Sequence, residues 1–342
     1  MRTDGKRVRN EVPDYYVGAH LMNKRYDALN MIEVDVPLAP ISAYVREKRK
    51  EGRRVSHLGV ILTAYLRTVA EFYKLNRFFV NKRPYARTDL SIGMVVLKPG
   101  DTDGTTSKFF LEYENDIFDV QRVLDEYVDG NRKDGDTNRT DRIARFLVNM
   151  PGLLSIGVSF IKLLDHLGWL PKAIIDASPF HSSMVISNLA SIGTNHIYHH
   201  VYHFGTTSVI LTIGVTKEIP RRHGDKVRFE RCLPFGIVMD ERICTGSYFA
   251  AAFARFKEYL ADPTLLEGES KYPIIREWAK PGDYEKLRAK RVYAEEKKRI
   301  AAKFATKSER REPLRRAKAE KKRALAEARS LKRAAKKKGK QE

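Results

Sequence analysis

One run of seventeen residues, His57 to Tyr73, constrains the fold of this chain most: HLGVILTAYLRTVAEFY. It is apolar on nearly all sides of a helix, and Ser56 before it is a plausible helix N-cap. A helix without a polar face is stable only when other elements cover it. The chain must therefore build a core around this run. Its 342 residues, 42% of them apolar, suffice for one large domain or two small ones.

Strand patterns occur on both sides of this helix. The segment MIEVDV, residues 31–36, alternates apolar and polar residues, and LSIGMVVL, residues 90–97, is a short apolar run. Because strands and helices do not alternate regularly, the sequence predicts an α+β fold, a mixed sheet with flanking helices, and not a doubly wound parallel sheet. Further strands are predicted at 108–113, 183–187, 207–215 and 227–239, with a charged turn at 220–225, and further helices after Pro37, after Asp116 and at 143–148, 153–170 and 247–260.

Several classes of protein are excluded by missing motifs. The chain has no P-loop, no dinucleotide-binding glycine pattern and no nucleophile elbow. Its two cysteines, Cys232 and Cys244, form neither a CxxC zinc pair nor a disulfide framework, and they fit a reducing compartment. The apolar segment 153–170 contains Lys162 and Asp165, so it does not read as a membrane-spanning helix. No secretory signal opens the chain, and we expect a cytoplasmic protein without a transmembrane segment.

Positive charge is concentrated at one end of the chain. Residues 284–342 hold 24 of the 64 Lys and Arg residues but only 8 of the 43 Asp and Glu residues. We therefore predict a polar N-terminal arm at 1–28, a core at 29–280 and a basic helical or disordered tail at 281–342. The tail either contacts a polyanion, such as nucleic acid or an anionic surface, or only keeps the protein soluble. Since no aromatic residue follows Phe304, base stacking is not offered.

Four of the nine histidines fall within eight residues, in the segment HIYHHVYHF. If the segment is helical, His196, His199, His200 and His203 share one face; if it is extended, they are divided between two. A metal site would need two or three imidazoles that converge on one ion. A polar turn, a subunit interface and an acyl pocket remain as alternatives. We expect no metal here and favour His199 and His200 as part of an interface or pocket.

A second cluster of polar residues follows a strongly apolar strand: Asp240, Glu241, Arg242, then Thr245 and Gly246 before a helix. The free backbone amides and the dipole at a helix N-terminus favour negative charge, so chemistry is well placed there. The alternative is purely structural. In that interpretation Arg242 forms a salt bridge with a neighbouring carboxylate, and the residue after Gly246, a serine, caps the helix.

A third cluster lies at the end of the strand predicted at 183–187, where Ser187 and Asn188 are followed by Ser191 and Gly193. A Ser–Asn pair that leaves a strand offers hydroxyl and amide donors to a developing oxyanion. The same residue types also fill ordinary turns, so the pair alone does not decide between the two.

The order and spacing of these clusters resemble the catalytic domain of the 2-oxoacid dehydrogenase acyltransferases. ISNLASIG is similar to that family's SN(L/I)GxxG stretch, and DERICTG, about fifty residues later, is similar to its DHRxxDG signature. The entry YDALNMIEVDVPL matches as well, so the resemblance covers residues 25–267. Chloramphenicol acetyltransferase has the same fold and an HxxxDG motif.

The resemblance implies a chloramphenicol acetyltransferase-like fold, a homotrimer and an active site in a channel between subunits. Coenzyme A or acyl-CoA is then a co-substrate that is not covalently bound, and the acceptor is an unknown thiol or hydroxyl. In this scheme Ser187 donates to the oxyanion in the other subunit and Arg242 orients the site. Asn188, Asp240, Thr245 and Gly246 lie around the substrate.

The chain departs from the family motif at its centre, because Glu241 stands in place of the catalytic His and Thr245 in place of the Asp. A carboxylate is a weaker base than imidazole at neutral pH, although burial would raise its pKa. His199 or His200 could supply the base instead. The sequence therefore predicts an acyltransferase-like protein. The alternative is a catalytically inactive member of this fold, a pseudoenzyme that serves as a binding or assembly module with a polyanion-binding tail.

Overall fold

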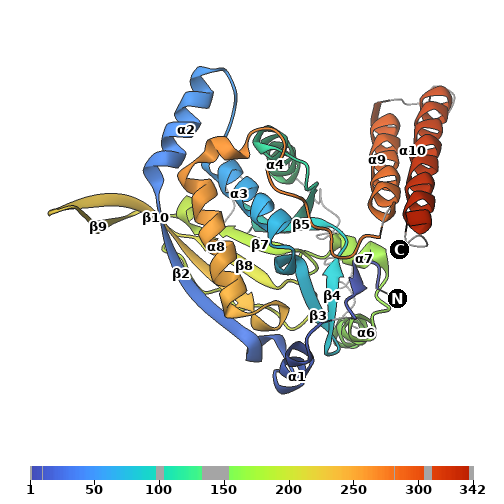
Figure 1. Ribbon diagram of the computed structural model, residues 1–342, viewed down its shortest axis with the longest axis horizontal. Helices are drawn as coiled ribbons and strands as arrows, with labels where there is room; N and C mark the ends of the chain where they lie inside the picture. Colours follow the sequence, from blue (N-terminus) through green and yellow to red (C-terminus); the bar gives the residue numbers. More distant parts are fainter. Residues whose placement is uncertain are drawn as a thin grey trace. The chain divides into compact units, whose positions relative to one another are not determined.

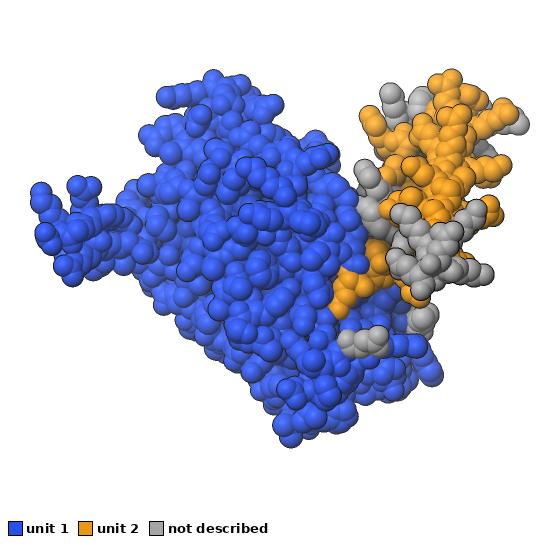
Figure 2. All heavy atoms as spheres, viewed as in Figure 1, with its two compact units in different colours: residues 1–276 blue, residues 277–342 orange. Residues whose placement is uncertain are grey.

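The structure is a computed structural model that describes residues 2–9, 11–97, 104–132, 154–280, 282–303 and 310–338. It consists of two compact units, residues 1–276 and 277–342 (Figure 2). The helix predicted at 143–148 lies outside the described residues.

A seven-stranded mixed sheet forms the centre of the first unit (Figure 1). The strand order is β2-β10-β8-β7-β5-β6, and β9 pairs with β10. The pairs β5–β7 and β7–β8 are parallel and the others are antiparallel, so the predicted mixed sheet is confirmed. The strands are β2 (Leu29–Pro37), β5 (Leu90–Leu97), β6 (Gly104–Leu111), β7 (Met184–Asn188), β8 (Val209–Ile213), β9 (Lys217–His223) and β10 (Lys226–Asp240).

Helices cover one face of this sheet (Figure 1). They are α2 (Leu38–Lys50), α3 (His57–Glu71), α4 (Ile117–Arg132) and α8 (Gly246–Ala261). As predicted, Ser56 caps α3 by accepting a hydrogen bond from the Gly59 backbone N–H at 3.0 Å, and every side chain from Gly59 to Ala70 is buried. Phe235 of β10 meets Phe256 of α8 edge to face, with 5.9 Å between the ring centroids.

The first residues differ from the predicted polar arm. β1 (Gly5–Arg7) pairs with β4 (Arg83–Arg87), which also pairs with β3 (Arg77–Val80), in a second, three-stranded sheet. The Arg2 and Asp4 side chains are buried against each other, 2.8 Å apart, and the charges compensate there. The remaining α-helices in the described residues of this unit are α1 (Pro13–Leu21), α6 (Leu154–Leu167) and α7 (Lys172–Ala177).

The charged turn predicted at residues 220–225 is shorter in the structure, because most of it belongs to β9. β9 and the first half of β10 form a hairpin that projects from the sheet (Figure 1). The hairpin is mostly exposed. Alternate residues of β9 are partly buried, but its sequence KEIPRRH has no regular alternation of apolar and polar residues. Val227 and Phe229 are apolar residues that the hairpin exposes, at 64% and 70%.

An irregular segment, residues 193–207, lies on the sheet face opposite α3 and α8. Val201 packs there against Ile210 and Val238, whereas the neighbouring residues of β8 and β10 face the helices. The Ile197 carbonyl accepts a hydrogen bond from Thr212 Oγ1 at 2.6 Å. The histidine segment is therefore not helical in the described structure.

The Gly236→Ala variant is expected to lose about 1–3 kcal/mol of unfolding free energy. The segment crosses β10 so closely that a Cβ at Gly236 would lie 2.5 Å from the Ile197 carbonyl oxygen. Urea-dependent reaction of the Cys232 and Cys244 thiols measures this, since both are buried in the first unit. A methyl group at Gly246 meets no atom within 4 Å, so Gly246→Ala is the control. Equal midpoints for the two variants would contradict the prediction.

The described residues of the second unit form two helices, α9 (Asp283–Lys303) and α10 (Arg311–Lys338). They are antiparallel, because Lys332 near the end of α10 forms an ion pair with Asp283 at the start of α9. Halfway along, the Lys321 ammonium lies 4.4 Å from the centre of the Tyr293 ring. Among the described residues, no helix combines the length and the apolar character needed to cross a membrane.

Candidate functional site

The Asp240 carboxylate is the centre of a buried ion cluster at the end of β10. It accepts hydrogen bonds from Arg242 Nε and Nη2 at 2.8 and 2.7 Å and from the Arg242 backbone N–H at 3.2 Å. Arg25 Nε lies 3.4 Å from Asp240 Oδ2, the oxygen that also accepts from Arg242 Nη2. Asp240 is completely buried and Arg242 nearly so, because β10 ends inside the core and the chain turns there toward α8. The salt bridge that the sequence left as an alternative is therefore present.

Arg25 is the residue of this cluster that the sequence did not reveal. It is buried, and its guanidinium donates to the carbonyls of Tyr202 and Gly205 at 3.0 Å and of Phe79 at 3.3 Å. Burial lowers the pKa of Arg25 to about 10, although Asp240 acts in the opposite direction. An arginine before a strand carries no sequence signal, and only the fold brings it to the turn.

Glu241 and Thr245 lie on the outer side of the same turn. Glu241 is exposed and makes no hydrogen bond or ion pair with any residue that the structure describes. Thr245 caps α8 by accepting a hydrogen bond from the Tyr248 backbone N–H at 3.4 Å, the role predicted for the serine at 247. Gly246 is the first residue of the helix. Glu241 is therefore available to a ligand or to another protein surface.

Ser187 and Asn188 end β7, and the strand register fixes where they lie. Ser187 is opposite Thr212 of β8, whereas the Asp240 backbone N–H bonds to the Ser208 carbonyl. At about 3.3 Å per residue, these two positions on β8 are about 13 Å apart along the strand. Ser187 and Glu241 thus lie at opposite ends of the sheet, two strands apart. A site that uses both must combine two copies of the chain.

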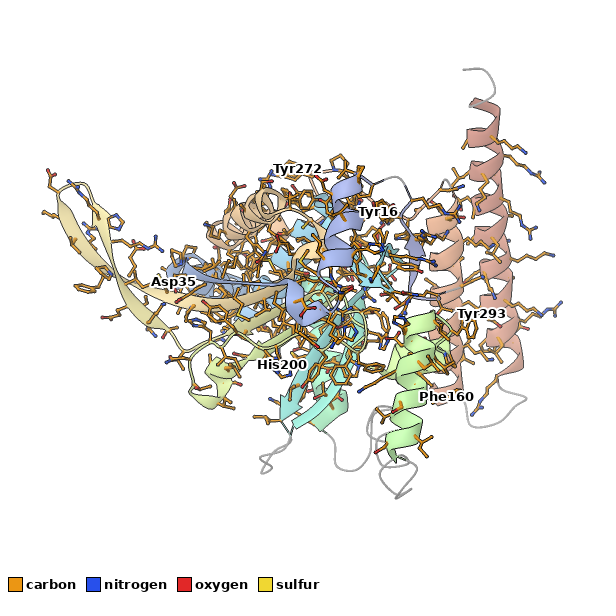
Figure 3. All side chains as sticks on the ribbon, turned by 90° about the horizontal axis from the view of Figure 1, so that it is seen from below. Tyr16, Asp35, Phe160, His200, Tyr272 and Tyr293 are labelled. Carbon is orange, nitrogen blue, oxygen red and sulfur yellow. The ribbon has the colours of Figure 1, made fainter. Side chains whose placement is uncertain are left out.

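The four histidines of the 196–203 segment do not converge. His199 and His200 stack on each other with 4.8 Å between ring centroids; His200 is exposed and His199 is half-buried. Figure 3 marks His200 on the side of the sheet away from α8. His196 lies 3.8 Å from Glu33, and His203 Nδ1 accepts the Arg25 backbone N–H at 3.3 Å. No three His, Cys, Asp or Glu residues of the described chain are grouped to hold a metal ion.

A second buried ion cluster joins α6 to the N-terminus. Asp165 Oδ1 accepts hydrogen bonds from Arg2 Nη1 at 2.8 Å and from His181 Nε2 at 3.1 Å, and Oδ2 accepts the Gly205 backbone N–H at 3.2 Å. Burial raises the pKa of Asp165, but His181 and Arg2 together lower it by more than burial raises it. The pKa of Asp165 is therefore well below its usual range. The carboxylate therefore fixes Gly205, whose carbonyl binds Arg25.

A mixed sheet with helices on one face, and a buried Asp–Arg turn between its long strand and the following helix, define an α+β domain. Residues 180–267 match the family model of the 2-oxoacid dehydrogenases acyltransferase (catalytic domain). This segment contains β7, β8, β10, the Asp240 turn and α8. The resemblance that the sequence indicated is confirmed over it, and acyl transfer is the general chemistry of that family.

Solved structures similar to this chain have low sequence identity to it. A probable dihydrolipoamide acetyltransferase from Listeria monocytogenes is 12% identical, with 78% of this chain and 99% of that chain covered and a TM-score of 0.49. The dihydrolipoamide acetyltransferase of Azotobacter vinelandii is 14% identical, with 76% and 94% covered and a TM-score of 0.48. A chloramphenicol acetyltransferase is 12% identical, with 75% and 99% covered and a TM-score of 0.48. No curated protein sequence matches the chain.

Proposed function

We propose that the first unit transfers an acyl group between coenzyme A and an acceptor with a hydroxyl or thiol group. The observation that carries the proposal is the buried pair of Asp240 and Arg242, which lies within the segment that matches the acyltransferase family. Arg25 completes this cluster from outside that segment. Asp240 is followed directly by Glu241, which stands in place of the motif His and begins the short turn Glu241–Ile243. Coenzyme A is a co-substrate here and is not covalently bound.

The active assembly is a homotrimer in which Ser187 of one copy meets Glu241 of another. Two observations support a contact between copies. Ser187 and Glu241 are separated by the strand register within one chain. In addition, apolar side chains near both edges of the sheet are exposed by 39–50%: Met31 on β2, and Val95, Leu97 and Phe110 on β5 and β6. Contact with another protein would remove these side chains from water.

In the reaction, Glu241 accepts the proton of the acceptor's hydroxyl or thiol group as that group attacks the thioester carbonyl. The Ser187 hydroxyl donates a hydrogen bond to the oxyanion of the tetrahedral intermediate. The carbon–sulfur bond then breaks, and the sulfur of coenzyme A takes the proton back from Glu241. A carboxylate is a weak base in water, and removal of water by a second copy makes a carboxylate a stronger base. His199 and His200 are the alternative bases, and Asn188 lines the acyl site beside Ser187.

The Glu241→Gln variant is expected to lose about 100-fold or more in kcat/KM, because the amide cannot accept the proton. Release of free coenzyme A from acetyl-CoA, with a panel of thiols and alcohols as acceptors, measures this. Glu47→Gln is the matched control, since Glu47 is an exposed glutamate of α2. Wild-type protein that releases no coenzyme A above background with any acceptor contradicts the proposed activity.

A second candidate function is a catalytically inactive binding module. Two observations favour it: Glu241 is exposed, and Thr245 caps α8. Within one chain, neither residue therefore takes the part of the catalytic His or of the Asp in the family motif. Restoring that motif with Glu241→His and Thr245→Asp tests it. A silent wild type and an active double variant support the module, whereas loss of a wild-type activity in Glu241→Ala rules it out.

The second unit offers this module a polyanion-binding surface. Six exposed basic residues of α10 form a stripe along the helix. At 100° per residue, they fall within an arc of about 60° over about 32 Å of helix. Lys322→Gln with Arg329→Gln should weaken the retention of duplex DNA and reduce its salt dependence, while Arg316→Gln with Arg323→Gln, off the stripe, should not. Equal losses in both pairs contradict a defined surface. The stripe consists of Arg315, Lys318, Lys322, Arg329, Arg333 and Lys336.

A further inference from the structure

A cavity of about 630 Å³ lies beside the Asp240 turn, where Arg242 lines it. Its walls come from the turn between β3 and β4, from α6, from residues 202–205 and from Arg25 and Arg242. Neither Glu241 nor Ser187 lines it. It is therefore a separate compartment next to the proposed acyl-transfer site.

Positive charge exceeds negative charge in these walls. The lining includes Arg25, Arg242, Lys82 and Lys162, and its single carboxylate among the described residues is Asp165. That carboxylate is already engaged by the second ion cluster, which includes Arg2. Asp240, behind the wall, is shared by the two arginines. Lys82 and Lys162 have no ion-pair partner in the described part of the chain.

The position of Lys82 is unusual for a lysine. Asn81 and Lys82 form the two-residue turn between β3 and β4 with φ angles of 47° and 59°, and glycine is the usual second residue of such a turn. A residue with a side chain at positive φ costs free energy. Here the side chain at this position lines the cavity, so a ligand contact would offset that cost.

The charges around His203, which also lines the cavity, are positive as well. Burial lowers the pKa of this imidazole, and the nearby charges of Arg25, Arg242, Lys24 and His166 lower it further. An anion in the cavity would act in the opposite direction and raise the pKa of His203. The histidine is thus a reporter of occupancy.

Apolar side chains complete the lining, among them Phe79, Leu163 and Phe204. We propose that the cavity binds a small phosphorylated molecule. The phosphate lies between Lys82, Lys162 and Arg242, and the organic part lies against the apolar side chains. Ammonium and guanidinium groups are the common partners of phosphate in proteins. Three such cations match a ligand with a phosphate dianion better than a ligand with a single carboxylate.

Isothermal titration of the full-length protein at constant ionic strength tests this, with inorganic phosphate, pyrophosphate and citrate as probes. Pyrophosphate should bind, and Lys82→Gln with Lys162→Gln should weaken it about tenfold or more. Lys226→Gln with Lys257→Gln removes the same charge from exposed positions elsewhere and should leave the affinity unchanged. Since glycine suits the positive φ, Lys82→Gly separates loss of the ammonium from damage to the turn.

Nuclear magnetic resonance of the imidazoles supplies the second readout. Pyrophosphate should raise the pKa of His203 in the wild type and leave it unchanged in the double Lys82 and Lys162 variant. Three results would overturn the proposal: no binding of either phosphate probe, equal losses in the two double variants, or citrate binding as tight as pyrophosphate.

Discussion

Replacing Asp240 by alanine is expected to lower the free energy of unfolding of the first unit by about 3–5 kcal/mol. The carboxylate is completely buried and is the counter-ion of Arg242 and Arg25, which are also buried. Its removal leaves two guanidinium groups away from water without compensation. Urea-dependent reaction of the two buried cysteine thiols reports the change, since both belong to the first unit.

An exposed aspartate provides the control for this prediction. Asp225, in the turn of the β9–β10 hairpin, is fully exposed, and Asp225→Ala should change the stability by less than about 0.5 kcal/mol. A loss below about 1 kcal/mol for Asp240→Ala would mean that the two arginines are compensated by other groups. The cluster would then not be what holds the turn.

Acidification is expected to destabilise the first unit in two stages. In each stage the free energy of unfolding falls by up to about 1.4 kcal/mol per pH unit for each titrating group. Burial lowers the pKa of His181 below its value in the unfolded chain, so stability falls as the pH drops below about 6.5. The pKa values of Asp4 and Asp165 are lowered as well, because their ion pairs outweigh burial. Their contribution is present above about pH 4 and is lost below it.

Urea unfolding at several pH values checks this, followed by the fluorescence of Trp169 in a Trp278→Phe background so that only the first unit is observed. Asp165→Asn should reduce the slope below pH 4, whereas Asp176→Asn, on the exposed side of α7, should not. A wild-type stability that stays constant from pH 7 to pH 3 would contradict the cluster's role.

Local patterns in the sequence were sufficient for much of the fold. The helix at residues 57–71 and its Ser56 cap follow from apolar residues on every side of a helix and one hydroxyl before it. The strands at 90–97 and 226–240 follow from apolar runs too short or too β-branched for helices. The turn after Asp240 was identified because a strand, a charged triplet and a helix occur in succession.

Other features depend on contacts between residues far apart in the chain. Arg25 reaches Asp240 across 215 positions of sequence, and Asp165 reaches Arg2 across 163. The N-terminal residues pair with β4 through backbone groups, which carry no sequence signal. β9 was missed because its partly buried positions are occupied by Lys217, Ile219 and Arg221, so its sequence lacks the apolar–polar alternation by which strands are recognised.

The sequence by itself determined the mixed α+β architecture, the central buried helix and the location of the Asp240 turn, because each depends on residues close together in the chain. Tertiary structure decided which charges are paired, and it placed Ser187 and Glu241 at opposite ends of the sheet. It also created the cavity beside Arg242. The physical reason is that strand register and the burial of charge are properties of the whole packed sheet, and no single segment contains them.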